Sequence, residues 1–170
     1  SAHRLREAIR SKWGIAKEAV LLNATHTHSA PYPAYGYHAA ALDSSRDADF
    51  HSYIRQLEKA IIRGVEDAMN SLEPVDIARG SGSCSFSTYR RKQIGGVWRM
   101  VPDVNVPVDQ EVIVVRLRKQ NGEVKALLVH YACHPTTTYD PMVSSDYPGT
   151  AMDRTEARLG TGAVSMFLQG

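Results

Sequence analysis

Two histidines separated by a single residue, His26 and His28, are the part of this sequence best suited to chemistry. They follow a short apolar run, 20–22, which predicts a buried strand, and the polar segment they belong to is closed by Pro31. In extended backbone, side chains two positions apart point the same way, so both imidazoles are expected to face one spot. Converging imidazoles suit a divalent transition metal, most often zinc. Loop histidines hydrogen-bonded to the backbone are the alternative interpretation.

A further histidine follows another strand-like run, more than a hundred residues later. The run 123–134 ends in His134, after which Pro135 opens a polar loop. His130 lies four residues earlier, a spacing that on a helix would match zinc proteases. Tyr131 occupies the position of their catalytic Glu and the run is rich in strand formers, so that interpretation is rejected. His130 is instead interpreted as a core histidine or a support for a metal ligand.

A basic stretch, Tyr89-Arg90-Arg91-Lys92, begins a polar loop that is broken by glycines and prolines and reaches Asp109. Such a stretch is commonly a solvated edge. An arginine here could instead hold a substrate oxygen or carboxylate through two parallel hydrogen bonds.

The helices that would position these residues are indicated by hydrophobic periodicity. Apolar residues at i+3 and i+4 steps predict helices over 1–13 and 49–72, the first ended by Gly14. A third helix is predicted to begin at Asp146, an N-cap candidate, and to end at Gly160.

Strands are indicated by apolar runs bounded by turn residues, and Asn121-Gly122 predicts a tight hairpin between two of them. Besides 20–22, strands are predicted over 75–87, 111–119, 123–134 and 163–169. The order α-β-α-β-β-β-α-β predicts an α/β layered domain with a mixed β-sheet flanked by helices.

Length and composition set the broad class of the protein. A chain of 170 residues is expected to form one domain, 1–170, with a proper core. The net charge of +2 comes without a Lys/Arg cluster that would follow a phosphate backbone, so no nucleic-acid partner is expected. No run approaches the roughly 20 apolar residues of a transmembrane helix. The first residue is not Met, and both ends fall in regular elements, so we expect a fragment of a larger protein whose compartment the sequence leaves open.

Taken in order, several segments resemble the amino-terminal domain of the neutral/alkaline, non-lysosomal ceramidase family. The pieces that carry the resemblance span nearly the whole chain: 24–31 (ATHTHSAP), Tyr89-Arg90-Arg91, Val108-Asp109, 132–135 (ACHP), 144–149 (SSDYPG) and 166–170 (MFLQG). Ceramidases of this family cleave the amide bond of ceramide with one zinc ion. The resemblance therefore implies a zinc-dependent hydrolase that cleaves an N-acyl (sphingo)lipid or a related amide by metal-activated water, and it is compatible with a secreted or periplasmic protein.

The resemblance also implies roles for individual residues. His26 and His134 are implied as two zinc ligands, whereas a Glu and a Tyr from remaining domains of the parent chain would complete the site. His28 is implied beside the reacting carbonyl, either as a group that supports the metal ligands or as a proton-handling group. Arg90 is implied as the group that holds the oxyanion or the polar head of the substrate, with Arg91 able to take its place. Because two histidines bind zinc weakly, the 170-residue chain alone is expected to carry little zinc and little amidase activity.

Several alternatives stay open at this point. The acceptor that orients the other nitrogen of each zinc-bound imidazole could be Asn23, Asp140 or Asp146. A serine nucleophile could be Ser29, Ser144 or Ser145, although none lies in a G-x-S-x-G elbow. The loops after His28 and His134 depart from the ceramidase pattern, which affects the substrate more than the metal. The alternative functions are another metal-dependent HxH hydrolase, an esterase or amidohydrolase acting on a small polar substrate, and a non-catalytic module that retains the fold.

Overall fold

A computed structural model describes residues 2–31, 47–138, 142–160 and 162–170 of the chain. They form two compact units: Ser1–Leu22 with Pro31–Glu73, and Asn23–Ala30 with Pro74–Gly170. The expectation of a single domain over the whole chain stays a prediction. Among the described residues, no helix is both long enough and apolar enough to cross a membrane.

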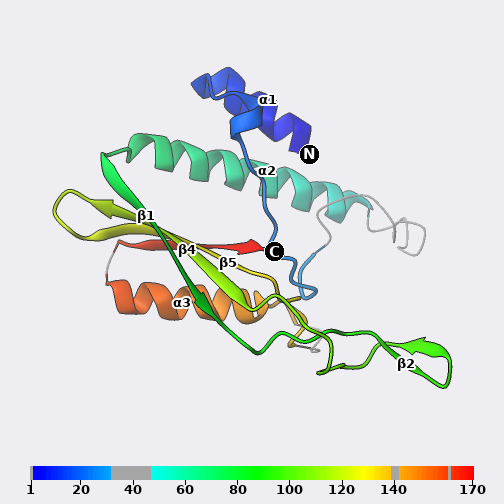
Figure 1. Cartoon of the computed structure of the whole chain (residues 1–170). Helices are drawn as coiled ribbons and strands as arrows, with labels where there is room; N and C mark the ends of the chain where they lie inside the picture. The colour runs from blue at the N-terminus through cyan, green and yellow to red at the C-terminus, as the bar shows by residue number, and fades with distance from the viewer. Residues whose placement is uncertain (1, 32–46, 139–141, 161) are drawn as a thin grey trace. The chain divides into compact units, whose positions relative to one another are not determined.

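The first unit is helical and agrees with the helices that periodicity predicted. Helix α1 spans Ala2–Trp13, a short 3₁₀ helix η1 spans Lys17–Ala19, and α2 spans Asp47–Asn70 (Figure 1). Buried Leu5 and Ile9 define the apolar side of α1. Two exposed ion pairs, Arg4–Glu58 and Lys12–Glu66, join α1 to α2.

The predicted strand over 20–22 is wrong. The chain after η1 has no regular structure as far as residue 28, and the Leu21 side chain is 76% exposed. The carbonyl of Val20 accepts a hydrogen bond from the Arg6 guanidinium, 3.1 Å away, instead of a ladder partner. A run of three apolar residues shows no periodicity, so it cannot distinguish a strand from an irregular segment.

The second unit is built on a mixed four-stranded sheet in the order β1-β4-β5-β6. Strands β1 (Val75–Ser83), β4 (Glu111–Lys119) and β5 (Val124–Tyr131) are antiparallel neighbours, and β6 (Val164–Gln169) is parallel to β5. The Asn-Gly turn between β4 and β5 is confirmed: Gly122 has φ +91° and its amide donates to the carbonyl of Lys119.

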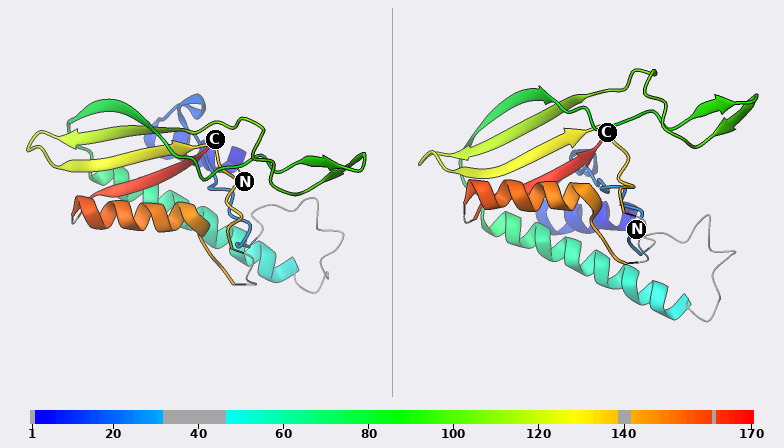
Figure 2. Two further views of the ribbon diagram at one scale, coloured as in Figure 1. Left: turned by 60° about the horizontal axis from the view of Figure 1, so that its bottom comes forward. Right: turned by 90° about the horizontal axis from the view of Figure 1, so that it is seen from below.

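Helix α3, Asp146–Leu159, connects β5 to β6 and runs alongside β6 (Figures 1 and 2). The mixed sheet, together with the three helices, confirms the predicted α/β class.

A two-stranded ribbon occupies part of the stretch that the sequence predicted to be a polar loop. Strands β2 (Lys92–Ile94) and β3 (Val97–Arg99) are joined by Gly95 and Gly96, both at positive φ, and the ribbon projects away from the main sheet (Figure 2). The loop expectation was wrong there because two glycines at positive φ make a tight hairpin turn even between strands of three residues.

Aromatic packing forms the core below the end of β5. Tyr131 is 3% exposed and Phe167 is 7% exposed. The Phe86 ring lies 5.1 Å from those of Tyr131 and Tyr147, and the Tyr147 ring lies 5.6 Å from that of Phe167. This cluster fixes the first turn of α3 against the sheet, at the sheet edge where His134 emerges.

Candidate metal centre

The segment that carries His26 and His28 is held by long-range hydrogen bonds instead of a strand ladder. Asn23 donates its side-chain amide to the carbonyl of Phe167 at 3.1 Å, and the Thr27 hydroxyl donates to the carbonyl of Ser144 at 2.8 Å. His26 has φ +65°, the left-handed region. The extended-backbone argument for convergence is therefore wrong, although the two rings do converge, with centroids 5.2 Å apart.

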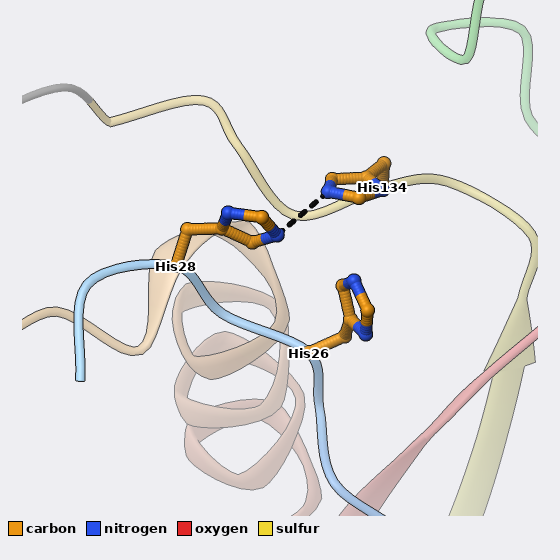
Figure 3. A group of neighbouring side chains, drawn as sticks. All are labelled: His26, His28 and His134. Atoms are coloured by element: carbon orange, nitrogen blue, oxygen red, sulfur yellow. Dashed lines mark hydrogen bonds between the residues drawn. The ribbon is translucent and has the colours of Figure 1, made fainter. Parts of the chain in front are cut away.

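His134 reaches the same place from the end of β5. The strand ends at Tyr131, and three residues later the chain turns, with the amide of Thr136 donating to the carbonyl of His134 at 2.9 Å. Pro135 is fully buried and anchors that turn. The turn directs the imidazole of His134 toward the segment of His26 and His28 (Figure 3).

The three imidazoles form one cluster, shown in Figure 3. One nitrogen from each of His26, His28 and His134 lies within 4.8 Å of those from the other two. The ring centroid of His134 is 4.7 Å from that of each partner, and its Nε2 is 2.8 Å from Nε2 of His28. His26 and His28 are exposed and His134 is half-buried, so the cluster opens toward solvent on one side.

Arg90 determines which nitrogen of His134 carries hydrogen. Its Nη2 lies 3.1 Å from Nδ1 of His134. A guanidinium can only donate, so Nδ1 accepts, and the neutral ring carries its hydrogen on Nε2, from which it donates to His28. Arg91 turns back and donates to the carbonyl of Arg90, so it is Arg90 and not Arg91 that contacts the cluster.

Burial lowers the pKa of His134, and the nearby charge of Arg90, with smaller contributions from the other two histidines, lowers it further. The neutral imidazole is thus favoured at neutral pH. A neutral imidazole is the form that binds a metal ion.

Two solved structures share the architecture that carries this cluster. One is a ceramidase complexed with C2 and the other is a neutral ceramidase from Pseudomonas aeruginosa. Each matches 99% of this chain with a TM-score of 0.76 at 22% sequence identity. The chain has the fold of a neutral ceramidase domain. The chain spans 27% and 28% of the length of those two proteins, and no family model matches its sequence.

The described carboxylate and amide side chains that could orient an imidazole are hydrogen-bonded to other groups. Asn23 binds the carbonyl of Phe167, and the carboxylate of Asp146 accepts from Thr137 and Thr138. Asp140 lies outside the described residues. The residue that does contact a ring nitrogen of the cluster is Arg90, a donor where the sequence predicted an acceptor.

Two of the three serine candidates have other hydrogen-bond partners. Ser29 Oγ lies 3.4 Å from the Thr138 hydroxyl, and Ser144 Oγ accepts from the amide of Asp146. Ser145 is the residue immediately before α3, where its side chain makes no capping hydrogen bond. None of these contacts supplies the imidazole base that a serine nucleophile needs.

His130 lies within the sheet, as the sequence predicted for a core histidine. It pairs with Ile113 on β4 and with Leu168 on β6. Its Nδ1 is buried without a hydrogen-bond partner among the described residues. A side chain at Gly170 would come within 2.6 Å of its Nε2, so the glycine lets the backbone pass close to this ring.

Proposed function

We propose that this chain is the zinc-binding domain of a ceramidase-like hydrolase that cleaves an amide bond of an N-acyl (sphingo)lipid or a related substrate. The observation that carries the proposal is the convergence of His26, His28 and His134 beyond the end of β5, although the last two lie 106 positions apart in the sequence. The fold supports it, because the two solved structures compared above, which share this fold, are both ceramidases.

The residues of the cluster fit zinc by their chemistry. Imidazole nitrogens are among the preferred zinc ligands, and catalytic zinc sites use few protein ligands and leave a position open. His26 and His134 are the proposed ligands, and the lowered pKa of His134 keeps its ring in the neutral form that binds metal. When bound, zinc lowers the pKa of a coordinated water to about 7 and polarises a carbonyl.

Arg90 is the proposed donor to the substrate oxygen. If Nε2 of His134 were to hold a metal ion, the neutral ring would carry its hydrogen on Nδ1, and this nitrogen would no longer accept from Arg90. The guanidinium then needs another acceptor. The carbonyl oxygen of an amide under attack gains negative charge and is such an acceptor.

His28 is the proposed proton carrier. When an amide is hydrolysed, the C–N bond breaks, the hydroxyl of water stays on the acyl carbon, and the amine leaves with a proton. Nε2 of His28 lies 2.8 Å from Nε2 of the proposed ligand His134, so its imidazole would lie beside a metal ion held by His134. A well-placed imidazole that delivers a proton accelerates such a step by about 10²–10⁴-fold.

Zinc analysis together with a substrate panel tests the proposal. Zinc affinity of the chain should fall in H26A and H134A and stay unchanged in H3A, which removes an exposed histidine outside the cluster. In the full-length protein, H28A and R90A should keep zinc and lose most of the activity toward N-acyl amides. R90A is expected to cost about 10²–10³-fold in kcat, as for loss of one oxyanion donor.

The same assays separate the alternatives. Activity that rises with acyl-chain length supports a lipid amidase, whereas turnover only of small polar esters or amides supports another HxH hydrolase. If full-length protein with stoichiometric zinc hydrolyses none of these substrates, the non-catalytic interpretation holds. Zinc binding that survives the H26A/H134A double substitution contradicts the proposed metal centre.

A further inference from the structure

Residues 144–147, which lead into the first turn of α3, contact both segments that carry the clustered histidines. We call them the α3 clamp. Their hydrogen bonds reach Cys133, Thr137 and Thr138 on one side and Thr27 and Ser29 on the other. The histidines themselves make none of these bonds, so the clamp acts on their backbone neighbours.

Asp146 holds the loop that follows His134. Its carboxylate is 4% exposed and accepts five hydrogen bonds: from the amide and hydroxyl of Thr137 at 2.9 and 2.7 Å, from those of Thr138 at 3.2 and 3.1 Å, and from the amide of Tyr147 at 2.6 Å. Burial alone would raise its pKa, but these donors outweigh it and the pKa is lowered. Asp146 also has φ +54°, an uncommon conformation that aspartate tolerates better than most residues.

Tyr147 holds the other side of His134. Its hydroxyl donates to the carbonyl of Cys133 at 2.5 Å. Burial raises the pKa of this phenol, so the hydroxyl stays protonated and keeps donating. The ring is fixed by Phe86 and Phe167, so the hydroxyl is held on a rigid support. The chain is thus fixed one residue before His134 by Tyr147, and three and four residues after it by Asp146.

Ser144 extends the clamp to the first histidine segment. Its carbonyl accepts from the Thr27 hydroxyl at 2.8 Å, and its amide donates to the carbonyl of Ser29 at 2.8 Å. Thr27 and Ser29 are the two residues on either side of His28. Ser144 is tied to the rest of the clamp because its own hydroxyl accepts from the amide of Asp146 at 3.0 Å.

We infer that Asp146 and Tyr147 are positioning residues of the histidine cluster, which set the distance between His134 and the pair His26 and His28. The expected effect on zinc binding rests on the proposed function, whereas the effect on the distances between the histidines does not. An ordinary helix cap accepts from amides of its own helix. Four of the five bonds to Asp146 come instead from the loop after His134, which is what a positioning role requires.

The test compares substitutions in the clamp with chemically matched substitutions elsewhere in the 170-residue chain. Y147F removes only the hydroxyl, and its control is Y131F, because the buried Tyr131 hydroxyl also donates to a backbone carbonyl, that of Cys84 at 2.8 Å. D146N is matched by D76N on the exposed surface. T137V removes one donor to Asp146, and T137S, which keeps the hydroxyl, is the rescue variant.

Three measurements are made on each variant: the melting temperature, the zinc Kd by competition with a chromophoric chelator, and the ¹⁵N shifts of the histidine rings without metal. Y147F, D146N and T137V should weaken zinc binding by about 10–100-fold, as for loss of groups that orient metal ligands. They should also lose the ¹⁵N signature of the hydrogen bond between His134 and His28. Y131F should lower the melting temperature with Kd and ring shifts unchanged, and T137S should behave as wild type.

The outcomes separate this inference from the proposed function. If the clamp variants keep wild-type Kd and ring shifts while their melting temperatures fall, the clamp is purely structural and the inference is wrong. If wild type binds no zinc through the cluster, the proposed function fails, and the ring shifts alone decide the inference. If Y147F or D146N does not fold, the milder T137V takes its place. Changed ring shifts in T137V then support the inference, and unchanged ring shifts overturn it.

Discussion

Replacing His134 by alanine removes one of the three imidazoles whose nitrogens lie within 4.8 Å of one another. If zinc binds to this cluster, it should raise the melting temperature of the wild-type chain, and H134A should abolish most of that rise. The effect depends on preferential binding to the folded state. An unfolded chain would have to close a loop of more than a hundred residues, between the proposed ligands His26 and His134, to bring both to one ion. Such a closure costs roughly 4–5 kcal/mol, so zinc binds the unfolded chain far less tightly.

The expected magnitude follows from mass action. Zinc at 100 times the wild-type Kd stabilises the folded chain by about 2.7 kcal/mol. For a chain of 170 residues, each kcal/mol shifts the melting temperature by about 2–4 °C, so the rise should be about 5–11 °C. Loss of a group that merely orients a ligand weakens metal binding by about 10–100-fold, so loss of a ligand should reach at least the upper value. At that affinity the same zinc concentration stabilises H134A by about 0.4 kcal/mol, a shift below about 2 °C.

The assay is a zinc titration followed by thermal unfolding of wild type, H26A, H28A, H134A and the control H3A. The control should reproduce the wild-type rise because His3 lies on α1, outside the cluster. An equal rise in wild type and H134A would refute the reasoning, since zinc would then stabilise the chain without the imidazole that joins the two segments. Reversal of the rise by a chelator shows that it comes from bound metal.

Other predictions concern stability. F167A should lower the free energy of unfolding in urea by about 3–5 kcal/mol, because Phe167 is 7% exposed and packs against Tyr147. M166A is its control: Met166 is 51% exposed on the same strand and its loss should cost far less. Equal losses in the two variants would contradict this packing of β6. G122A should lower the free energy of unfolding by about 1–2 kcal/mol, because φ is +91° at this position. G80A should change the stability very little, because Gly80 has a negative φ and open space for a Cβ. An unchanged stability of G122A would argue against the tight hairpin. The pKa of Asp146 is lowered in the folded chain, so its ionised form stabilises the fold at pH values above the unfolded pKa of about 3.9. This contribution is lost as the pH falls through the folded pKa, and the difference in stability between wild type and D146N should therefore shrink in acid. A difference that does not change with pH would contradict an ionised Asp146.

The three helices and the β4–β5 hairpin of this protein were determined by local sequence signals. Helices α1 and α2 follow from apolar residues at helical spacing, α3 follows from the end signals Asp146 and Gly160, and the β4–β5 hairpin follows from Asn121-Gly122. These patterns are reliable because each depends on neighbours a few positions away. The candidate metal ligands also stand out in the sequence, since an H-x-H pair and a histidine at the end of a strand-like run are local features.

The manner in which the cluster is assembled was decided only by the tertiary structure. The segment of His26 is held by hydrogen bonds that Thr27 and Ser29 make with Ser144, more than a hundred residues away. No periodic pattern in the sequence predicts such partners. The contact of Arg90 with His134, in preference to Arg91, depends on how the chain turns before β2. The carboxylate of Asp146 looks like a helix cap in sequence, but four of its five hydrogen bonds come from the loop after His134. Residue type and spacing therefore determined which groups can bind a metal, whereas long-range hydrogen bonds determined whether those groups meet.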